Sequence, residues 1–386
     1  MHTCRMYFPQ FAKVDFKAGF ILQISKYQST LRKASLGVLF CWVVGLSKPL
    51  PVWSQASTPA KPTESEAATP AEQPSSTSKA ATDSFLYAAV ITKAIDVWNP
   101  PQADRLSGSI EELDAQRIVF LENEKRREIP SDRVYRVEPV WRTRNAADAH
   151  KLFTARRYRE AKEAIAKAVT NDLPRWQQRL MVAEFVDVFA ALGEYRLAGG
   201  VYVKSLAANQ PPAMLLAQLP MNWTSLEPDR MHYEAAVEWL ESDDEFAQLL
   251  GASWMLLGPD RENARAQLSK LQSSKNQAIA SLAVAQGWRL VPPLETPTKL
   301  AEWFAFRDRL LEPLQVGPTE FIAERCARTG MVDIAVGQWS RIATMHADQP
   351  HRAFNALTAA ARTLNQTNRG EEAKRFIAWA DEFKAQ

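Results

Sequence analysis

Apolar residues recur along the C-terminal part of the chain at intervals of three and four residues, the spacing that places side chains on one face of a helix. The clearest case is one stretch in which Tyr158, Ala161, Ile165 and Ala168 follow in the order aromatic, small, apolar, small. Small residues let two helices approach closely, and the aromatic ring fills the gap beside them. The pattern predicts a helix on which these four side chains serve packing.

The same order returns further along the chain, at an interval of about 37 residues or close to twice that. It recurs in the stretches Tyr195–Ser205, Tyr233–Leu240, Ala264–Leu271, Val332–Ile342 and Gly370–Ala380. A degenerate copy around Leu300–Trp303 occupies the longest interval. About seven units of about 35 residues would fill residues 141–386, a length typical of helix–turn–helix repeats.

The helix before each of these stretches is expected to be amphipathic as well, since Val182, Phe185 and Phe189 share one face. This array resembles tetratricopeptide repeats. It departs from them in having Val186 where the first helix usually has a small residue, and a Pro-rich, Trp-containing interruption at residues 209–231. The resemblance implies a mainly α tetratricopeptide-like solenoid with an irregular middle, in which the first helix of each pair lines a concave protein-binding surface.

Residues 85–140 have a hydrophobic period of two, which is typical of short strands. Predicted strands are Phe85–Ile91, Ala94–Trp98, Leu106–Ile110, Arg117–Leu121, Arg127–Ile129 and Arg133–Val137. Polar turns separate them at Leu113–Ala115 and Glu122–Glu124. The run from 106 to 139 resembles the SH3-like small β-barrels, including the Sla1-homology type. This resemblance implies a small antiparallel β-barrel-like module. We expect Trp98 and Tyr135 to be buried in its small core, and a peptide groove lined by these two rings is the alternative.

The first 56 residues have the order of a secretory signal. An apolar run at 34–46 follows Arg32 and Lys33 and precedes small residues, so cleavage after Ala56 is expected. The protein would then be exported to the periplasm, the cell envelope or the medium. The run is shorter than the roughly 20 residues of a spanning helix, and an uncleaved membrane anchor is the alternative. Residues 57–84 are mostly Ala, Ser, Thr, Pro, Glu and Lys, which predicts a disordered tether.

Charge and cysteine content also change once the signal is removed. The whole chain carries a net charge of +3, but the basic excess belongs to the first 56 residues, and the remainder is slightly acidic. The basic character is therefore no indication of nucleic-acid binding. Cys326 is then the only cysteine, so no intrachain disulfide is expected, and it is interpreted as a small buried hydrophobe.

No phosphate-binding loop, nucleophile elbow or zinc-binding motif is present in the sequence. We therefore expect a non-enzymatic protein without a cofactor. The strongest local cluster of potential metal ligands, His346, Asp348 and His351, lies in a predicted turn and is a weak metal candidate.

The tetratricopeptide resemblance implies a peptide-binding surface on the first helices. Matched to this sequence, it comprises His150, Asp187, Arg325, Arg328, Arg362 and Asn365. Three guanidinium groups in one groove would suit a carboxylate, so the expected partner is a protein or peptide, possibly acidic in character. A solvated helix face is the alternative interpretation of these residues.

Ten tryptophans follow residue 56. We expect most of them to pack between helices. The rival function is a cell-envelope glycan-binding protein, in which exposed tryptophan rings would contact sugar.

Overall fold

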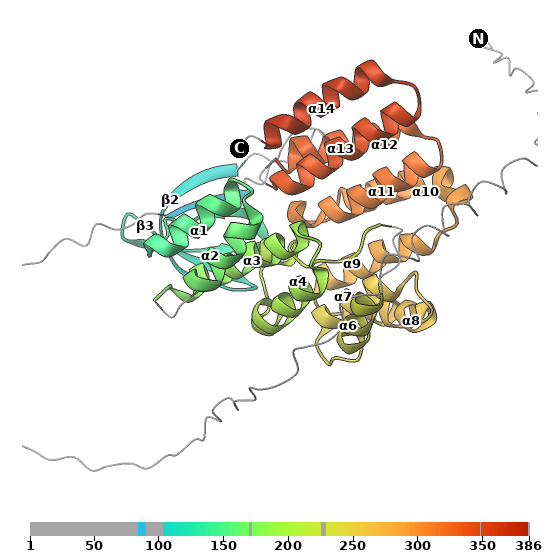
Figure 1. The fold of residues 1–386 in the computed structure, drawn as a ribbon. Helices are drawn as coiled ribbons and strands as arrows, with labels where there is room; N and C mark the ends of the chain where they lie inside the picture. Colours follow the sequence, from blue (N-terminus) through green and yellow to red (C-terminus); the bar gives the residue numbers. More distant parts are fainter. Residues whose placement is uncertain (1–83, 90–102, 170–171, 225–228, 348, 385–386) are drawn as a thin grey trace, which may run out of the picture. The chain divides into compact units, whose positions relative to one another are not determined.

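The computed structural model describes residues 84–89, 103–169, 172–224, 229–347 and 349–384, all of which belong to one compact unit that runs from Ser76 to Gln386. The predicted signal, residues 57–83 of the predicted tether and the predicted strand at 94–98 lie outside the described residues. The described part is predominantly helical and begins with an antiparallel sheet (Figure 1).

Five strands and fourteen α-helices are described. The strands are β1 (Ser84–Ala89), β2 (Ala103–Leu113), β3 (Arg117–Glu122), β4 (Lys125–Pro130) and β5 (Val134–Glu138). The helices are α1 (Arg144–Thr154), α2 (Tyr158–Ala168), α3 (Arg175–Ala191), α4 (Tyr195–Val201), α5 (Ala213–Leu216), α6 (Arg230–Leu240), α7 (Glu245–Met255), α8 (Arg261–Leu271), α9 (Gln277–Gly287), α10 (Thr296–Arg307), α11 (Val316–Arg328), α12 (Val332–Met345), α13 (Pro350–Gln366) and α14 (Gly370–Lys384).

The strands form a single antiparallel sheet in the order β4-β3-β2-β1-β5. Strand β2 is shared between two halves, because its first part pairs with β1 and its last part pairs with β3. Gly108 lies where these parts meet, and a Cβ there would lie 2.1 Å from the carbonyl oxygen of Leu121. Only glycine permits this close approach of two strands.

Local sequence explains the turns of the sheet. Asn123 and Glu124, in the predicted turn between β3 and β4, have φ angles of 49° and 63°, which suit a two-residue hairpin loop. After β4 a single 3-10 turn (Ser131–Arg133) directs the chain into β5. The prediction of a barrel is not confirmed: β4 and β5 are the two edges, no described pairing joins them, and the sheet is open.

The repeated small and apolar residues are buried, as predicted from their spacing. Ala161, Ile165 and Ala168 on α2 are inaccessible to solvent or nearly so. Equivalent positions on later helices are also buried, namely Ala198, Tyr202, Ala236, Ala264, Leu268, Ala335, Trp339, Ile342, Ala373 and Ala380. Exceptions are Ser205, which is exposed, and Ile377 on α14, which is 46% exposed because no later helix covers it in the described chain.

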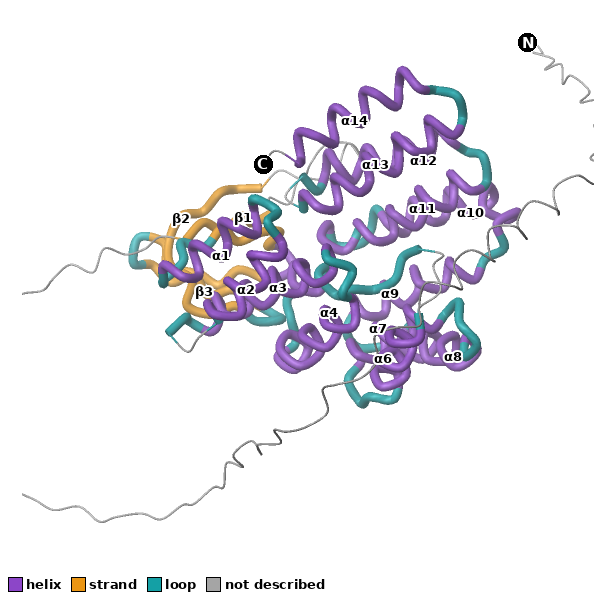
Figure 2. Tube along the Cα trace, viewed as in Figure 1, coloured by secondary structure: helices purple, strands orange, loops and turns teal. Residues whose placement is uncertain are grey.

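Consecutive helices pack against one another from α1 to α4, from α6 to α9 and from α10 to α14 (Figures 1 and 2). The middle of the chain is irregular, as the sequence indicated. There α4 passes into a π-helical turn (Tyr202–Leu206), α5 is a single turn, and the chain is non-helical from Leu219 to Thr224. A continuous solenoid is therefore not confirmed, although Pro174 and Pro350 stand at helix starts, as expected.

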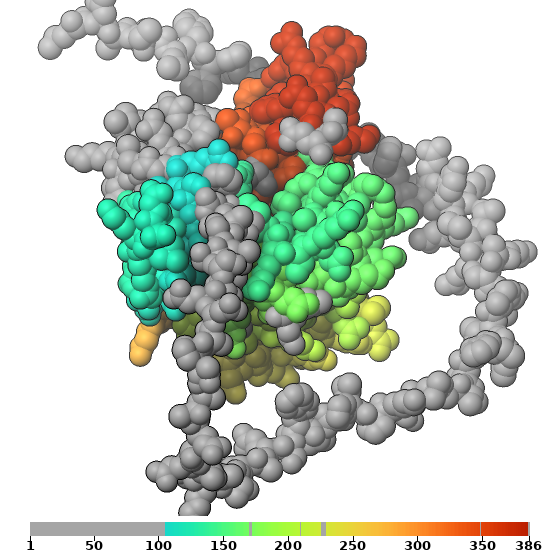
Figure 3. All heavy atoms as spheres, turned by 90° about the vertical axis from the view of Figure 1, so that its left-hand side faces the viewer, coloured from blue at the N-terminus to red at the C-terminus, as the bar shows by residue number. Residues whose placement is uncertain are grey.

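The sheet and the helices are joined through α3. Arg179 Nη1 donates to the carbonyl of Leu113 at 2.5 Å, and Gln177 Nε2 donates to the carbonyl of Val140 at 2.9 Å. In the space-filling view the cyan and teal strand residues lie directly beside the green residues of the first helices (Figure 3). These polar contacts fix the start of the helical part against the sheet.

Candidate functional site

A groove of about 880 Å³ lies among the helices. Its walls come from the end of α3, the start of α4, the non-helical residues 220–224, Trp254 of α7, and long faces of α11 and α13. Helix α13 lines it from His351 to Gln366, and Thr367 follows directly after the helix. The volume lies in the range of ligand-binding clefts, which makes the groove the strongest candidate site of the described chain.

One end of the groove is basic. Arg328 and Arg362 lie near the C-terminal ends of α11 and α13, beside Thr363, Gln366 and Thr367. The Arg328 side chain is 52% exposed and lies 3.9 Å from Glu324, an i,i+4 pair. Arg362 is exposed and forms no hydrogen bond or ion pair with any described residue. Its guanidinium group can therefore bind a carboxylate without breaking an existing contact.

The other end brings Glu320 of α11 close to Arg352 of α13, and the neighbouring His351 also lines the groove. This follows from the fold, because α11 and α13 are each joined to α12 by a short turn and so run in the same direction. Burial raises the pKa of Glu320, and nearby Arg352 opposes this effect. Burial, assisted by Arg352 and Arg156, lowers the pKa of His351 to about 3, so this imidazole is neutral near pH 7.

Aromatic rings also contribute to the groove. The Tyr195 ring lies 5.1 Å from that of Trp254, which in turn stacks on His232 at 5.5 Å. Trp223 and Trp339 are further lining residues, and both are buried. Tyr195, at 36%, is the most exposed of these rings. The groove therefore combines an aromatic wall with a basic end.

The non-helical segment at residues 220–224 is held by side chains from α7, α9 and the turn after α9. Trp254 Nε1 donates to the carbonyl of Pro220 at 3.0 Å, and Gln286 Nε2 donates to the carbonyl of Asn222 at 3.2 Å. Arg289 Nη2 donates to the carbonyl of Thr224 at 2.9 Å. Both Gln286 and Arg289 are buried, and burial lowers the pKa of Arg289 to about 10. The wall of the groove thus includes one stretch of the protein's own main chain.

Of the six residues predicted to bind a peptide, Arg328 and Arg362 line the groove and the other four do not. Arg325 is buried, and its guanidinium group donates to the carbonyls of Val291 at 2.9 Å and Arg289 at 3.3 Å. Its role is to fasten the turn after α9 to α11. Asn365 is exposed on α13 but outside the groove, with its Oδ1 near Gly370.

His150 and Asp187 lie on α1 and α3, away from the groove lining. His150 Nδ1 lies 2.6 Å from Glu184 Oε1, and burial lowers the pKa of this histidine less than the Glu184 contact raises it. Asp187 is buried and faces Gln218, whose amide nitrogen, when turned toward it, donates at 2.5 and 2.8 Å. Both residues make contacts within the protein.

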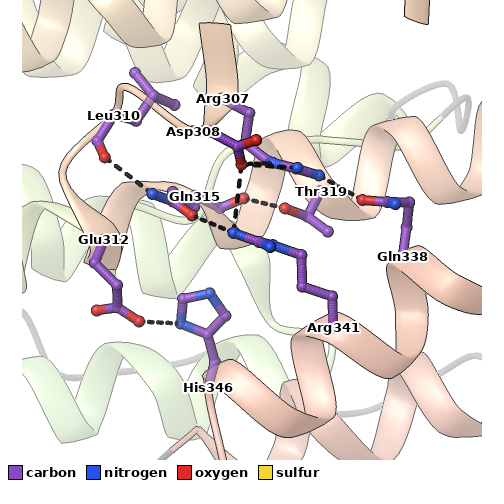
Figure 4. Close-up of polar contacts among 9 residues, drawn as sticks. All are labelled: Arg307, Asp308, Leu310, Glu312, Gln315, Thr319, Gln338, Arg341 and His346. Atoms are coloured by element: carbon purple, nitrogen blue, oxygen red, sulfur yellow. Dashed lines mark hydrogen bonds and ion pairs between the residues drawn. The ribbon is translucent and has the colours of Figure 1, made fainter. Parts of the chain in front are cut away.

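The proposed metal cluster is divided in the structure. His346 is buried, and its Nδ1 lies 3.0 Å from Glu312 Oε1 (Figure 4). His351 instead lines the groove, and Asp348 lies outside the described residues. Within the described ranges no three His, Cys, Asp or Glu side chains are arranged to hold a metal ion.

Figure 4 also shows a buried polar network beside His346 that sequence analysis did not anticipate. Arg307 and Arg341 both contact Asp308 Oδ1, at 2.8 and 3.3 Å. Arg341 also donates to Gln315 Oε1 at 3.2 Å. This network joins the α10–α11 connection to α12, and it lies away from the groove lining.

Sequence reasoning missed Glu320, Arg352 and residues 220–224. The interruption at 209–231 was visible as a gap in the repeat, but the position of residues 220–224 in the groove wall depends on contacts with residues far along the chain. Arg352 Nη2, for example, donates to the carbonyl of Ala217 at 3.3 Å, across 135 positions. Gly317 on α11 was a small indication of this packing, because a Cβ there would lie 2.1 Å from Trp223 Nε1 and only glycine makes room for the ring.

No protein family, curated protein or solved structure matches this chain. Among the described helices none is long and apolar enough to cross a membrane. The function is therefore argued from the groove itself.

Proposed function

We propose that the protein is a non-enzymatic adaptor that binds a peptide segment of a partner protein in the groove between α3, α11 and α13. The observation that carries the proposal is the exposed Arg362 side chain at the basic end of an 880 Å³ groove. A carboxylate of the partner would pair with Arg362, and with Arg328 beside it. The partner segment is thus expected to be acidic at that end.

Two features support a tetratricopeptide-like arrangement for the helical part. The repeated alanines on α2, α4, α12 and α14 are buried, namely Ala161, Ala168, Ala198, Ala335, Ala373 and Ala380. The helices that precede α4, α12 and α14 are α3, α11 and α13, and these three contribute most of the helical residues that line the groove. In this arrangement the first helix of each pair forms the concave surface, and its exposed polar residues determine which partner binds.

The sheet is proposed to be an SH3-like module. Its support is the strand order, the long strand β2 shared between two halves, and the 3-10 turn between β4 and β5. The hydrogen bond from Arg179 on α3 to the Leu113 carbonyl of β2 supports a structural role for it. Export to the periplasm, the cell envelope or the medium remains a further proposal, supported by the composition of residues 1–56.

A test of the adaptor function uses the full chain immobilised and panned against a displayed library of random 12-residue peptides. We expect enriched peptides to carry Asp or Glu and to lose at least about tenfold in affinity with Arg362→Glu, because a charge-assisted contact becomes a repulsion. Arg375→Glu on α14 is the matched control, since Arg375 is exposed and outside the groove lining. Equal loss in both variants, or enrichment of no peptide, would refute the proposal.

The second candidate function is binding of a cell-envelope glycan, favoured by Tyr195 and Trp254 in the groove wall. Aromatic faces can bind the apolar face of a sugar ring. A sedimentation assay with purified cell-wall polymer distinguishes the two functions. Binding to the polymer that Tyr195→Ala abolishes and Arg362→Glu leaves unchanged would favour the glycan.

A further inference from the structure

The end of the groove opposite Arg362 holds two aromatic rings and a carboxylate. Tyr195 of α4 and Trp254 of α7 line it together with Glu320 of α11. The two ring centroids lie 5.1 Å apart and the ring planes are inclined by 50°, so the rings form two sides of an open corner. Burial raises the pKa of Tyr195, and the nearby negative charge of Glu320 adds to this effect. The carboxylate therefore lies close to the aromatic corner.

Contacts with neighbouring side chains hold both rings. Trp254 stacks on His232 at a centroid distance of 5.5 Å, and its Nε1 donates to the carbonyl of Pro220 at 3.0 Å. The His232 ring also lies 6.0 Å from that of Tyr195. His232 is positioned in turn by Asp229, whose Oδ1 lies 2.7 Å from its Nδ1. An aromatic site that is fixed before binding loses little conformational entropy when a ligand enters it.

The carboxylate of Glu320 is available to a ligand. Glu320 lines the groove and forms no hydrogen bond or ion pair with any described residue. Arg352 lies nearby, but no ion pair joins the two, and Arg352 Nη2 donates to the carbonyl of Ala217 at 3.3 Å. His351, at the same end, is neutral near pH 7 because burial lowers its pKa to about 3. Within the described chain Glu320 thus lacks a close cationic partner.

We propose that Tyr195, Trp254 and Glu320 form a binding site for an ammonium group of the peptide ligand. This inference rests on the proposed function and specifies the ligand at the end of the groove away from Arg362. Aromatic faces attract cations within about 6 Å of the ring centroid, and a carboxylate accepts hydrogen bonds from an ammonium group. Burial raises the pKa of Glu320, and a cation bound beside it favours the ionised carboxylate. The ammonium group belongs either to a lysine side chain or to the N-terminus of the ligand.

The two ends of the groove also define how far apart the charges of the ligand lie. Glu320 and Arg328 are two helical turns apart on α11, which corresponds to about 12 Å along the helix axis. Glu324 lies between them and lines the groove, but its carboxylate pairs with Arg328 at 3.9 Å. An extended chain covers about 12 Å in about four residues. The ligand is therefore a peptide with an ammonium group about four residues away from a carboxylate.

Changes to the ligand test the site without altering the protein. The strongest 12-residue peptide from the panned library is resynthesised in two forms, and each form is titrated against the full chain. In one form norleucine, which lacks the charge, replaces each lysine, and in the other the N-terminal amine is acetylated. We expect one of these changes to weaken binding at least about tenfold, because the cation–π and charged hydrogen-bond contacts are lost. Loss with norleucine assigns a lysine side chain, and loss on acetylation assigns the N-terminus.

Variants of the protein assign the effect to Glu320. Glu320→Gln removes the charge and keeps the shape, so it should weaken the ammonium-bearing peptide about tenfold and leave the uncharged form unchanged. Glu238→Gln on α6 is the matched control, since Glu238 is exposed and outside the groove lining. An equal effect of Glu320→Gln on both peptide forms would overturn the role of this carboxylate. Should that variant not fold, Tyr195→Ala, at a partly exposed ring, provides the same comparison.

The outcomes distinguish this inference from the proposed function. If a peptide binds and Arg362→Glu weakens it, but neither norleucine nor acetylation does, the ammonium site is refuted while the adaptor function stands. If no peptide binds, both fail. Weaker binding with Tyr195→Ala alone, without an effect of the ligand charge, would also contradict the ammonium site and leave the rings as an apolar wall.

Discussion

The most quantitative prediction concerns His351, at the end of the groove opposite the basic one. Burial, with Arg352 and Arg156 nearby, lowers the pKa of this histidine to about 3. The ordinary value in an unfolded chain is about 6.5. As the pH falls below about 6.5, the unfolded chain binds a proton at this residue and the folded chain does not. Stability is therefore lost progressively between about pH 6.5 and pH 3.

The size of the effect follows from the pKa difference. Each pH unit in this window costs about 1.4 kcal/mol, so the loss is about 2 kcal/mol at pH 5 and at most about 5 kcal/mol near pH 3. Glu320 acts in the opposite direction, because burial raises its pKa and the folded protein then binds a proton more readily than the unfolded chain. The contribution of His351 must therefore be isolated by comparison with a variant.

The assay is urea unfolding, followed by tryptophan fluorescence at pH 7.5 and pH 5, of the unmodified protein and of His351→Gln. Contributions from other groups are common to both proteins and cancel in the difference. We expect the unmodified protein to lose about 2 kcal/mol more than the variant between the two pH values. A difference between the proteins that stays constant with pH would refute the reasoning.

His150→Gln is the matched control, with the opposite sign. The hydrogen bond and charge of Glu184 outweigh burial and raise the pKa of His150. A raised pKa contributes stability that is present below the unfolded value and is lost as the pH rises through the folded value. Lowering the pH from 7.5 to 5 should therefore stabilise the unmodified protein relative to His150→Gln.

Other predictions test the packing around the groove. Arg325→Met removes the two hydrogen bonds of a buried guanidinium group and should lower the free energy of unfolding, measured in urea, by about 2–4 kcal/mol. Arg328→Met, at an exposed side chain, is the control and should change it by less than about 0.5 kcal/mol. Equal effects would contradict the assignment. Gly199→Ala would place a methyl group of α4 2.3 Å from the Trp239 ring of α6. Scanning fluorimetry should therefore show a lower Tm, corresponding to a loss of about 1–3 kcal/mol in the free energy of unfolding. An unchanged Tm would mean that α4 and α6 can move apart without an energetic cost. Burial raises the pKa of Cys326 to about 11. Alkylation of this thiol by iodoacetamide at pH 8, followed by mass spectrometry, should therefore be far slower in the native protein than in urea. Equal rates would show that the thiol is accessible in the native protein.

Helix positions could be predicted because the periodicity of a helix is local. The spacing of Tyr158, Ala161 and Ile165 defines one face of α2, and the structure buries Ala161 and Ile165 on that face. Strand positions in the sheet followed from the period of two and from turn residues such as Asn123. Each of these signals lies within a few neighbouring residues, and backbone geometry alone converts it into structure.

Which residues line the candidate site could not be predicted in this way, because it depends on contacts between distant parts of the chain. Arg325 and Arg328 are three residues apart on α11, and the same peptide-binding role was predicted for both. In the structure Arg325 is buried under the turn after α9 while Arg328 reaches the groove. Whether a side chain of α11 is buried or reaches the groove depends on which residues pack on each face of the helix. Those residues come from distant parts of the chain.

The helical class, the strands before the helices and the faces that pack could thus be predicted from the pattern of residues along the chain. Tertiary structure alone decided where the groove lies, and that residues 220–224 enter it. The physical reason is that side chains of Trp254, Gln286 and Arg289 satisfy the main chain of this segment. Such bonds leave no pattern in the segment that accepts them, because every residue has a carbonyl group.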